Sequence, residues 1–411
     1  MTVARVVTVG AAHLGAHDDA AGLQVARALL AEGLSVASRE VVDEDEAALE
    51  ALLRAPFEGV RLTVVLAPPG GSAGEIVRRV LARIAGARLV LSERLLGLLE
   101  EDFARRGQAM PRRHERLALL PQGAQPWPAP SGEPGWALAT PHGLVAVLPL
   151  GSAHLASLIE AYVKPAAREG LGPGGASVLR TLRTAGLSAA EAEERLGAFL
   201  GKEGDVQVAC LPAAGDVWVR LLARGASRPL AEAALVEVEA AVRRALGPDC
   251  YGADEESIEA VVGRLLVERG FTVSVAEACT GGLLASRLCS VPGASRYFER
   301  GVVAYSNRAK EELLGVPEAL LHSHGAVSAP VTEAMAGGIC RVGRSACGLA
   351  ITGIAGPDGG SADKPVGTVF VGSASPAGIE VRRFRFAGGR EAIKWQSSQA
   401  ALDMLRRALA G

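Results

Sequence analysis

The segment "AEACTGG", Ala276 to Gly282, follows the strand-like run "FTVSV" and precedes the helix-like run "LLASRL". A turn between a strand and a helix often carries a nucleophile or binds an anion, because the first N–H groups of the helix are free to donate. Gly281 and Gly282 would let a ligand approach the backbone closely. Ala278, which opens the turn, has only a methyl group. The residues alone therefore leave two readings open, a phosphate or carboxylate site and a purely structural tight turn.

A candidate base lies in a second glycine-bearing stretch, "VPGASRYFERGVVAYSNRAKEELLGV". A helix that begins near Asn307 would place Lys310 in its first turn, close to the strand end that carries Tyr305. A partly desolvated lysine loses its proton more easily and can act as a general base toward a hydroxyl. An ordinary surface lysine is the alternative. Ser295, in the same stretch, is either a hydrogen-bond donor to a ligand or a turn-capping hydroxyl.

A third turn, "LAITGIAGPDGG", follows another strand-like run. Thr352 could donate a hydrogen bond to a ligand, and the backbone around Gly353 and Gly356 could cradle an anion. Because loops at strand ends of an α/β sheet converge on one edge, the three turns are expected to meet there. None of them is a Walker A loop or a dinucleotide-binding fingerprint.

The elements that must position these turns predict three domains in a mixed α/β and α+β chain. Residues 1–170 alternate strand and helix, which favours a parallel sheet covered by helices. Their Pro-rich stretch "PQGAQPWPAPSGEPGW" is expected to be a surface loop. Residues 171–252 begin at the break "GLGPGGAS" and read α-β-β-α. Residues 253–411 read α-β-α-β-α-α-β-β-β-α and contain all three turns.

Composition excludes several classes of protein. The 411 residues carry a net charge of -2 and are 49% hydrophobic, which argues against a disordered chain and a generally basic nucleic-acid binder. The six cysteines form no C-x-x-C pair, so neither a zinc site nor a disulfide framework is expected. No apolar run is long enough to span a membrane. We expect a cytoplasmic protein with reduced thiols.

Seven motifs occur in an order that resembles the CinA family (competence/damage-inducible protein A). They are "AEACTGG", "PGAS", "GVVAYSNRAK", "LGV", "GAVS", "TGIAGP" and "KPVGTV". The resemblance implies a molybdopterin-binding-like N-terminal domain, a small KH-like middle domain and a CinA-type α/β/α C-terminal domain. It also implies that the C-terminal domain is of the nicotinamide mononucleotide amidohydrolase type, releasing ammonia, and that the protein is a homodimer.

The resemblance assigns roles to individual residues. The family uses a Ser–Lys dyad, in which the lysine matches Lys310 and the serine matches Ala278. Cys279 is the nearest substitute nucleophile, although a neighbouring side chain on a turn points elsewhere. The other pocket residues implied are Thr280, Gly281, Gly282, Ser295, Tyr305, Thr352, Gly353, Gly356 and Arg390, the last from "FAGGREAIK". Loss of the nucleophile leaves only about 10³–10⁴-fold residual catalysis in comparable enzymes.

The N-terminal domain departs further from the family pattern, which implies a metal-dependent ADP-ribose pyrophosphatase. The loop after the third strand reads "APPGGSAGE", where Glu75 is the only acid. Since magnesium bound to a diphosphate needs carboxylate ligands, we expect no metal there and no pyrophosphatase activity. Two readings apply to another group of residues, which either form a different metal site or are solvated loop residues: His13, His17, Asp18, Asp19 and Asp43.

Two functions remain open at this stage. The first is a hydrolase of pyridine-nucleotide salvage that uses an alternative nucleophile, with no cofactor in the C-terminal domain. The second is a non-catalytic protein that binds nicotinamide mononucleotide, a related nucleotide, or a partner in competence and recombination. Neither reading involves a membrane.

Overall fold

The computed structural model describes residues 3–10, 19–32, 34–55, 59–130, 132–170, 176–201, 204–213 and 215–410. By contacts the chain forms two units, Met1–Leu179 with Ala223–Leu235, and Arg180–Leu222 with Val236–Gly411. The predicted class, a multidomain α/β and α+β chain, is confirmed by its separate sheets. The predicted domain limits stay predictions.

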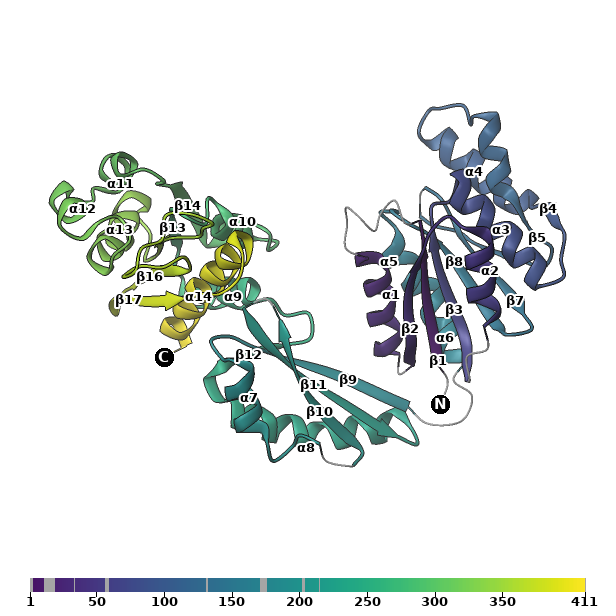
Figure 1. Cartoon of the computed structure of the whole chain (residues 1–411), viewed down its shortest axis with the longest axis horizontal. Helices are drawn as coiled ribbons and strands as arrows, with labels where there is room; N and C mark the ends of the chain where they lie inside the picture. The colour runs from purple at the N-terminus through teal and green to yellow at the C-terminus, as the bar shows by residue number, and fades with distance from the viewer. Residues whose placement is uncertain are drawn as a thin grey trace. The chain divides into compact units, whose positions relative to one another are not determined.

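The N-terminal sheet has six strands in the order β2-β1-β3-β8-β7-β6. Strands β1, β2, β3 and β8 are parallel to one another, and β7 and β6 are antiparallel. Helices cover both faces, so the inward side chains form two separate apolar clusters (Figure 1). The strands are β1 (Val3–Val9), β2 (Ser35–Val42), β3 (Val60–Ala67), β6 (Gln125–Trp127), β7 (Gly135–Thr140) and β8 (Gly143–Pro149). The main helices are α1 (Ala20–Ala31), α2 (Glu46–Arg54), α3 (Gly71–Ile84), α4 (Glu93–Arg105), α5 (Leu155–Leu158) and α6 (Lys164–Gly170).

The Pro-rich stretch is not the surface loop that the sequence predicted. It contains the end of β5 (Leu119–Pro121), which pairs with β4 (Leu89–Leu91), all of β6 and the start of β7. Proline is tolerated at the edge of a sheet because an edge strand can do without one ladder hydrogen bond. The two tryptophans of the stretch, Trp127 and Trp136, are buried in the clusters and hold it against the sheet.

The middle domain is a four-stranded sheet in the order β10-β11-β9-β12 with two helices. Its elements are β9 (Ala176–Thr184), α7 (Ala189–Leu196), β10 (Val206–Ala213), β11 (Asp216–Gly225), α8 (Arg228–Leu246) and β12 (Cys250–Ala253). The predicted α-β-β-α core is confirmed, and α7 begins with the expected capping box of Ser188 and Glu191. The flanking strands β9 and β12 were not predicted, because one adjoins a Gly/Pro-rich break and the other has only four residues.

The C-terminal domain has a five-stranded sheet in the order β14-β13-β15-β16-β17. Strand β13, an interior strand, is parallel to both neighbours, whereas β16 is antiparallel to β15 and to β17. The strands are β13 (Val273–Glu277), β14 (Phe298–Val303), β15 (Cys347–Gly353), β16 (Thr368–Ser375) and β17 (Gly378–Arg385). The helices are α9 (Ile258–Arg269), α10 (Leu283–Cys289), α11 (Asn307–Leu314), α12 (Glu318–His324), α13 (Ala329–Gly343) and α14 (Arg390–Ala410). The sequence predicted one helix fewer between β14 and β15, since α12 is short.

The helices of this domain lie on both faces of the sheet, as Figure 1 shows. One face packs side chains of α9, α10 and α14 around Val275. The other packs side chains of α11, α12 and α13 around Ala276. Successive residues of β13 therefore point to opposite cores, as the period of a strand requires.

A chain of polar contacts joins the middle domain to the C-terminal domain inside the second unit. Arg287 on α10 donates to Glu259 at 2.5 Å and to the side-chain oxygen of Gln399 at 2.5 Å. Gln399 then donates to Asp216 at 2.7 Å, and the Tyr251 hydroxyl donates to the same carboxylate oxygen at 3.5 Å. The other oxygen of Asp216 is buried and has no hydrogen-bond partner in the part of the chain that the structure describes.

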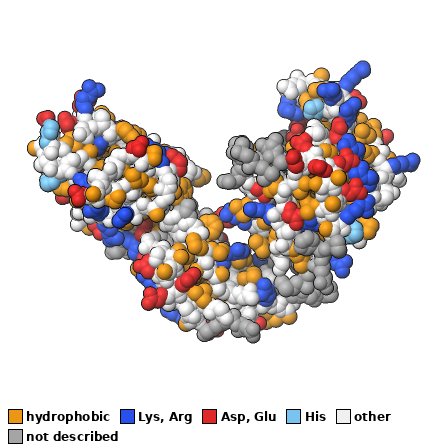
Figure 2. All heavy atoms as spheres, viewed as in Figure 1, with side chains coloured by type: hydrophobic (Ala, Val, Ile, Leu, Met, Phe, Trp, Pro, Cys, Tyr) orange, Lys and Arg blue, Asp and Glu red, His pale blue; other side chains and the backbone are white. Residues whose placement is uncertain are grey.

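The surface charges agree with the small net charge. On the face seen in Figure 2, acidic and basic side chains of the N-terminal domain are interspersed. Between α2 and α3, for example, Arg79 and Arg83 both pair with Glu46, at 2.6 and 2.5 Å. Among the described residues, no helix is both long enough and apolar enough to cross a membrane.

Candidate functional site

The turn of residues 278–282 joins the carboxyl end of β13 to α10. The Ala278 amide donates to the Ile351 carbonyl at 2.9 Å, which extends the pairing with β15 by one residue. Gly281 and Gly282 have φ angles of 65° and 100°. Only glycine adopts such angles without strain, so the two glycines are needed for the tight return into α10.

The start of α10 already has an anionic partner, the side chain of Glu277. Its two carboxylate oxygens accept hydrogen bonds from the amides of Gly282 at 3.1 Å, Leu284 at 3.0 Å and Ala285 at 2.8 Å. Glu277 is 1% exposed. Of the two readings that the sequence left open at this helix, an anion site and a structural turn, the anion position is thus occupied by the protein's own carboxylate. Glu277 lies inside the motif "AEACTGG" but was not among the predicted site residues.

Ala278, which the resemblance matched to the family's serine, is 6% exposed and contributes only a methyl group to the turn. Cys279 is equally buried, and its side chain packs into the cluster of α9, α10 and α14 around Val275. Burial is the main reason that the pKa of the Cys279 thiol is raised to about 11; Glu277 acts in the same direction, and a backbone hydrogen bond, Arg390 and Lys310 act in the opposite one. At neutral pH this thiol is protonated and a weak nucleophile.

Lys310 lies on the first turn of α11, as the sequence predicted, but it is not a surface lysine. It is 2% exposed, and its ammonium group donates to the backbone carbonyls of Tyr305 at 3.1 Å and Ser306 at 3.5 Å. Ser306 caps α11 by accepting from the Ala309 amide. Burial lowers the pKa of Lys310 below its usual value of 10.5, with nearby Cys279 acting in the opposite direction. Deprotonation to the neutral amine that a general base requires is therefore easier than in a solvent-exposed lysine.

Arg390 brings two of the predicted turns together. Its guanidinium donates to the Gly356 carbonyl at 2.7 Å and to the Tyr305 hydroxyl at 3.4 Å. Tyr305 is 65% exposed, and its backbone carbonyl is the one that receives Lys310. Lys310, Tyr305, Arg390 and Gly356 thus form one connected group at the edge of the sheet.

The remaining predicted residues, two threonines, a serine and a glycine, differ in burial and in their contacts. Thr352 and Thr280 are each 1% exposed; the Thr352 hydroxyl donates to the Ala326 carbonyl at 2.9 Å, while the Thr280 hydroxyl has no hydrogen-bond partner among the described residues. Ser295 is exposed on a short 3₁₀ turn, and no contact joins it to this group. A Cβ atom at Gly353 would lie 2.7 Å from Val369, so this glycine is required by close packing of β15 on β16.

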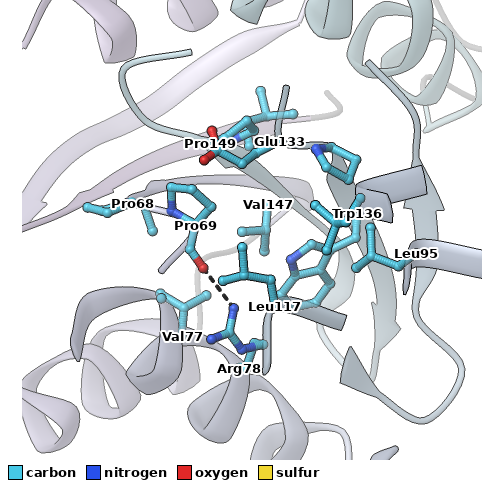
Figure 3. Close-up of a pocket in the computed structure, with 15 residues that line it drawn as sticks. Pro68, Pro69, Val77, Arg78, Leu95, Leu117, Glu133, Trp136, Val147 and Pro149 are labelled. Atoms are coloured by element: carbon cyan, nitrogen blue, oxygen red, sulfur yellow. Dashed lines mark hydrogen bonds between the residues drawn. The ribbon is translucent and has the colours of Figure 1, made fainter. Parts of the chain in front are cut away.

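The loop after β3 lines a separate pocket in the N-terminal domain (Figure 3). Pro68, Pro69, Val147 and Trp136 line it together with Arg78, whose guanidinium donates to the Pro69 carbonyl at 2.9 Å. Burial lowers the pKa of Arg78 below its usual value. Among the described residues that line this pocket, the only carboxylate is that of Glu133. The lining is mainly apolar, which is not the set of oxygen ligands that magnesium prefers.

The acids and histidines considered for a metal site have other contacts where they are described. Asp19 caps α1 and accepts from the Thr8 hydroxyl at 3.0 Å, and Asp43 accepts from the Glu44 amide. Glu75 pairs with Arg79 and Arg116. His13, His17 and Asp18 lie outside the described residues. Across the part of the chain that the structure describes, no three His, Cys, Asp or Glu residues are grouped to hold a metal.

Two families match segments of the chain. Residues 255–409 match the CinA C-terminal domain, and residues 179–252 match the KH domain of damage-inducible protein CinA. A CinA-like protein of Geobacter sulfurreducens is 39% identical over 394 residues, covering 95% of each chain. A CinA-like protein of Geobacter metallireducens is 38% identical over 397 residues, covering 96% of each. Among solved structures, the competence/damage inducible protein CihA of Agrobacterium tumefaciens is 40% identical; the match covers 38% of this chain and 96% of that one, with a TM-score of 0.36.

Proposed function

Because the chain belongs to the CinA family, we propose that its C-terminal domain binds nicotinamide mononucleotide or a closely related nucleotide. The domain has the scaffold of an amide hydrolase but lacks the attacking oxygen. The observation that carries this proposal is the buried Lys310 at the sheet edge where the turn of Ala278 ends β13. A lysine kept nearly free of solvent, with a lowered pKa, is costly to a fold and typical of a catalytic base.

Hydrolysis of the nicotinamide amide requires a nucleophile and a base. With a serine at position 278, its hydroxyl oxygen would attack the carboxamide carbon while the neutral amine of Lys310 takes the proton. Ammonia would leave with a proton returned from Lys310, and water would then hydrolyse the acyl ester. The sum is nicotinamide mononucleotide plus water giving nicotinic acid mononucleotide plus ammonia. The methyl group of Ala278 cannot perform the first step.

Cys279 does not replace the missing serine in this proposal. Its side chain packs with the apolar cluster around Val275, whereas α11, which carries Lys310, packs on the opposite face around Ala276. Its thiol also has a raised pKa. We therefore propose nucleotide binding with little turnover. The C-terminal domain would need no cofactor, and the exposed Arg390 would meet the phosphate of the nucleotide.

The test compares wild type with Ala278→Ser in the full-length protein. Calorimetry should detect binding of nicotinamide mononucleotide to both proteins. Ammonia release should be slight in the wild type and rise by about 10²-fold or more in Ala278→Ser, as expected for a restored nucleophile.

The matched control is the double variant Ala278→Ser/Lys310→Met, which keeps the nucleophile and removes the base. It should lose most of the restored rate. Rapid hydrolysis by the wild type would contradict the proposal, because it would require another nucleophile. Absence of nucleotide binding in both proteins would remove its basis and leave a partner-binding role in competence as the remaining hypothesis.

A further inference from the structure

The contacts of Glu277 are unusual for an acidic residue at the end of an interior strand. Its side chain is buried between the sheet and α10, and no lysine, arginine or histidine forms an ion pair with it within the described chain. Three backbone amides satisfy it instead, those of Gly282, Leu284 and Ala285. Hydrogen bonds from N–H groups to a carboxylate are among the stronger ones in proteins.

These bonds close the turn of residues 278–282 into a ring. The backbone of Glu277 is fixed in the sheet, because its carbonyl accepts from the Ala304 amide at 2.8 Å. The Ala278 amide is held by the Ile351 carbonyl on the other side. The side chain of Glu277 then reaches past the turn to the first amides of α10. Both ends of the turn are thereby tied to one residue of β13.

The N-cap position of α10 offers no other support. It is Gly282, which has no side chain to accept from the helix amides. In most helices a Ser, Thr, Asp or Asn at this position does so. Glu277 supplies the missing acceptor from five residues earlier in the chain, which leaves the left-handed conformation of Gly282 free to make the turn.

We infer that Glu277 is a positioning residue, which fixes the turn carrying position 278 by satisfying the amides at the start of α10. This inference rests on the proposed function for its catalytic consequence, but its structural part is independent of it. A carboxylate at these amides also neutralises the end of a helix that would otherwise stabilise an anion. The start of α10 then stabilises neither the phosphate of a nucleotide nor a thiolate at Cys279.

The state of Cys279 supports this second consequence. A cysteine close to helix-start amides ordinarily has a lowered pKa. Burial instead raises the pKa of Cys279 to about 11, and Glu277 acts in the same direction. Cys347 on β15 provides an internal reference, since burial raises its pKa to about 11 as well and Glu277 is not among the causes.

The catalytic test uses Ala278→Ser as the reference and adds Glu277→Gln, which keeps the shape of the side chain. Turnover of nicotinamide mononucleotide should fall by about 10- to 100-fold, as expected for a displaced nucleophile, with KM changed by less than about threefold. Glu299→Gln, at an exposed position on β14, is the matched control and should leave both constants unchanged.

A second measurement does not depend on hydrolysis. Alkylation of individual cysteines by iodoacetamide is followed by peptide mass spectrometry across a range of pH. In Glu277→Gln alone, the midpoint for Cys279 should fall by about one pH unit or more, while that for Cys347 stays in place. If Ala278→Ser proves inactive, the proposed function fails and this titration still decides the role of Glu277.

Glu277→Asp covers the case in which Glu277→Gln does not fold. Its shorter side chain keeps the charge but cannot reach the three amides in the same way, so turnover should fall while the Cys279 midpoint stays near that of the wild type. The inference is wrong if a folded Glu277→Gln protein shows neither the loss of turnover nor the shift at Cys279.

Discussion

At the scale of single residues, the burial of Lys310 has a measurable consequence for stability. In the folded protein the ammonium group is removed from water, which costs desolvation free energy. The neutral amine does not carry this cost. Since burial lowers the pKa of Lys310 below 10.5 in the folded state, the unfolded chain binds more protons in the interval between the two values. Stability contributed by this group therefore rises with pH across that interval.

We expect the Lys310→Met protein to be more stable than wild type at neutral pH, and this difference in stability to shrink as the pH rises. Thermal unfolding of both proteins at about pH 7 and about pH 10 measures the difference in Tm. Lys394→Met is the control, since Lys394 lies on α14 and pairs with Glu391 at 3.0 Å. An identical difference at both pH values would show that the buried amine does not titrate in the expected direction.

The residues of the site were predictable to different degrees. Lys310 could be placed because "SNRAK" contains a serine cap and sets the start of α11. Glu277 could not, because an acid at a strand end reads as solvent-exposed and its partners follow five to eight residues later. The orientation of the Cys279 side chain could not be predicted from the sequence either, because it depends on which of the two apolar clusters the side chain enters after β13 ends.

At the scale of elements, the contact between α11 and α13 holds Lys310 in place. A Cβ atom at Gly338 on α13 would lie 2.2 Å from the Leu314 carbonyl at the end of α11. At neighbouring Gly337 the closest atom would be the flexible end of Ile379, at 3.3 Å. The two helices can therefore approach closely only because residue 338 has no side chain.

This pair of glycines makes a matched test. Gly338→Ala should lower the free energy of unfolding by about 1–3 kcal/mol, because backbone must move to admit the methyl group. Gly337→Ala should be neutral or raise it by up to about 1 kcal/mol, from the better helix propensity of alanine. Urea denaturation of the two variants measures both changes. Equal effects would mean that the helices do not pack as closely as described.

Elements with strong local signals were predicted well, and those fixed by distant partners were not. The capping box at Ser188 and Glu191 correctly marked α7. The strands β9 and β12 become recognisable only through their pairing with each other across more than sixty residues, as in the register of Cys250 with Thr184. Edge strand β6 was concealed by its prolines.

At the scale of the whole molecule, the junction of the middle and C-terminal domains contains a titratable group. Burial raises the pKa of Asp216 from 3.8 to about 6, opposed by the hydrogen bond from Gln399. Asp216 lies on β11, yet Gln399 is 183 residues later on α14, so no local pattern could have indicated the contact. The charged and titratable groups facing it are Arg183, Tyr251, Glu259, Arg287 and Asp403.

Between these two pKa values the folded protein holds a proton that the unfolded chain releases, so stability contributed by Asp216 falls as pH rises. Asp216→Asn removes the titration and keeps an oxygen to accept from Gln399. The Tm of the variant minus that of wild type should therefore increase between about pH 4 and about pH 7. Asp205→Asn, an exposed acid before β10, is the control. A constant difference would show that Asp216 is ionised in both states.

The clamp that Glu277 places on the turn of residues 278–282 also has a thermodynamic consequence. A backbone whose amides are already satisfied has little conformational freedom left to lose when a small molecule arrives. A small molecule that binds at this edge of the sheet should therefore meet a preorganised backbone, and the turn should not change its conformation on binding. The backbone of residues 278–282 should superimpose closely between the free and ligand-bound proteins. The loss of conformational entropy on binding should come mainly from the ligand.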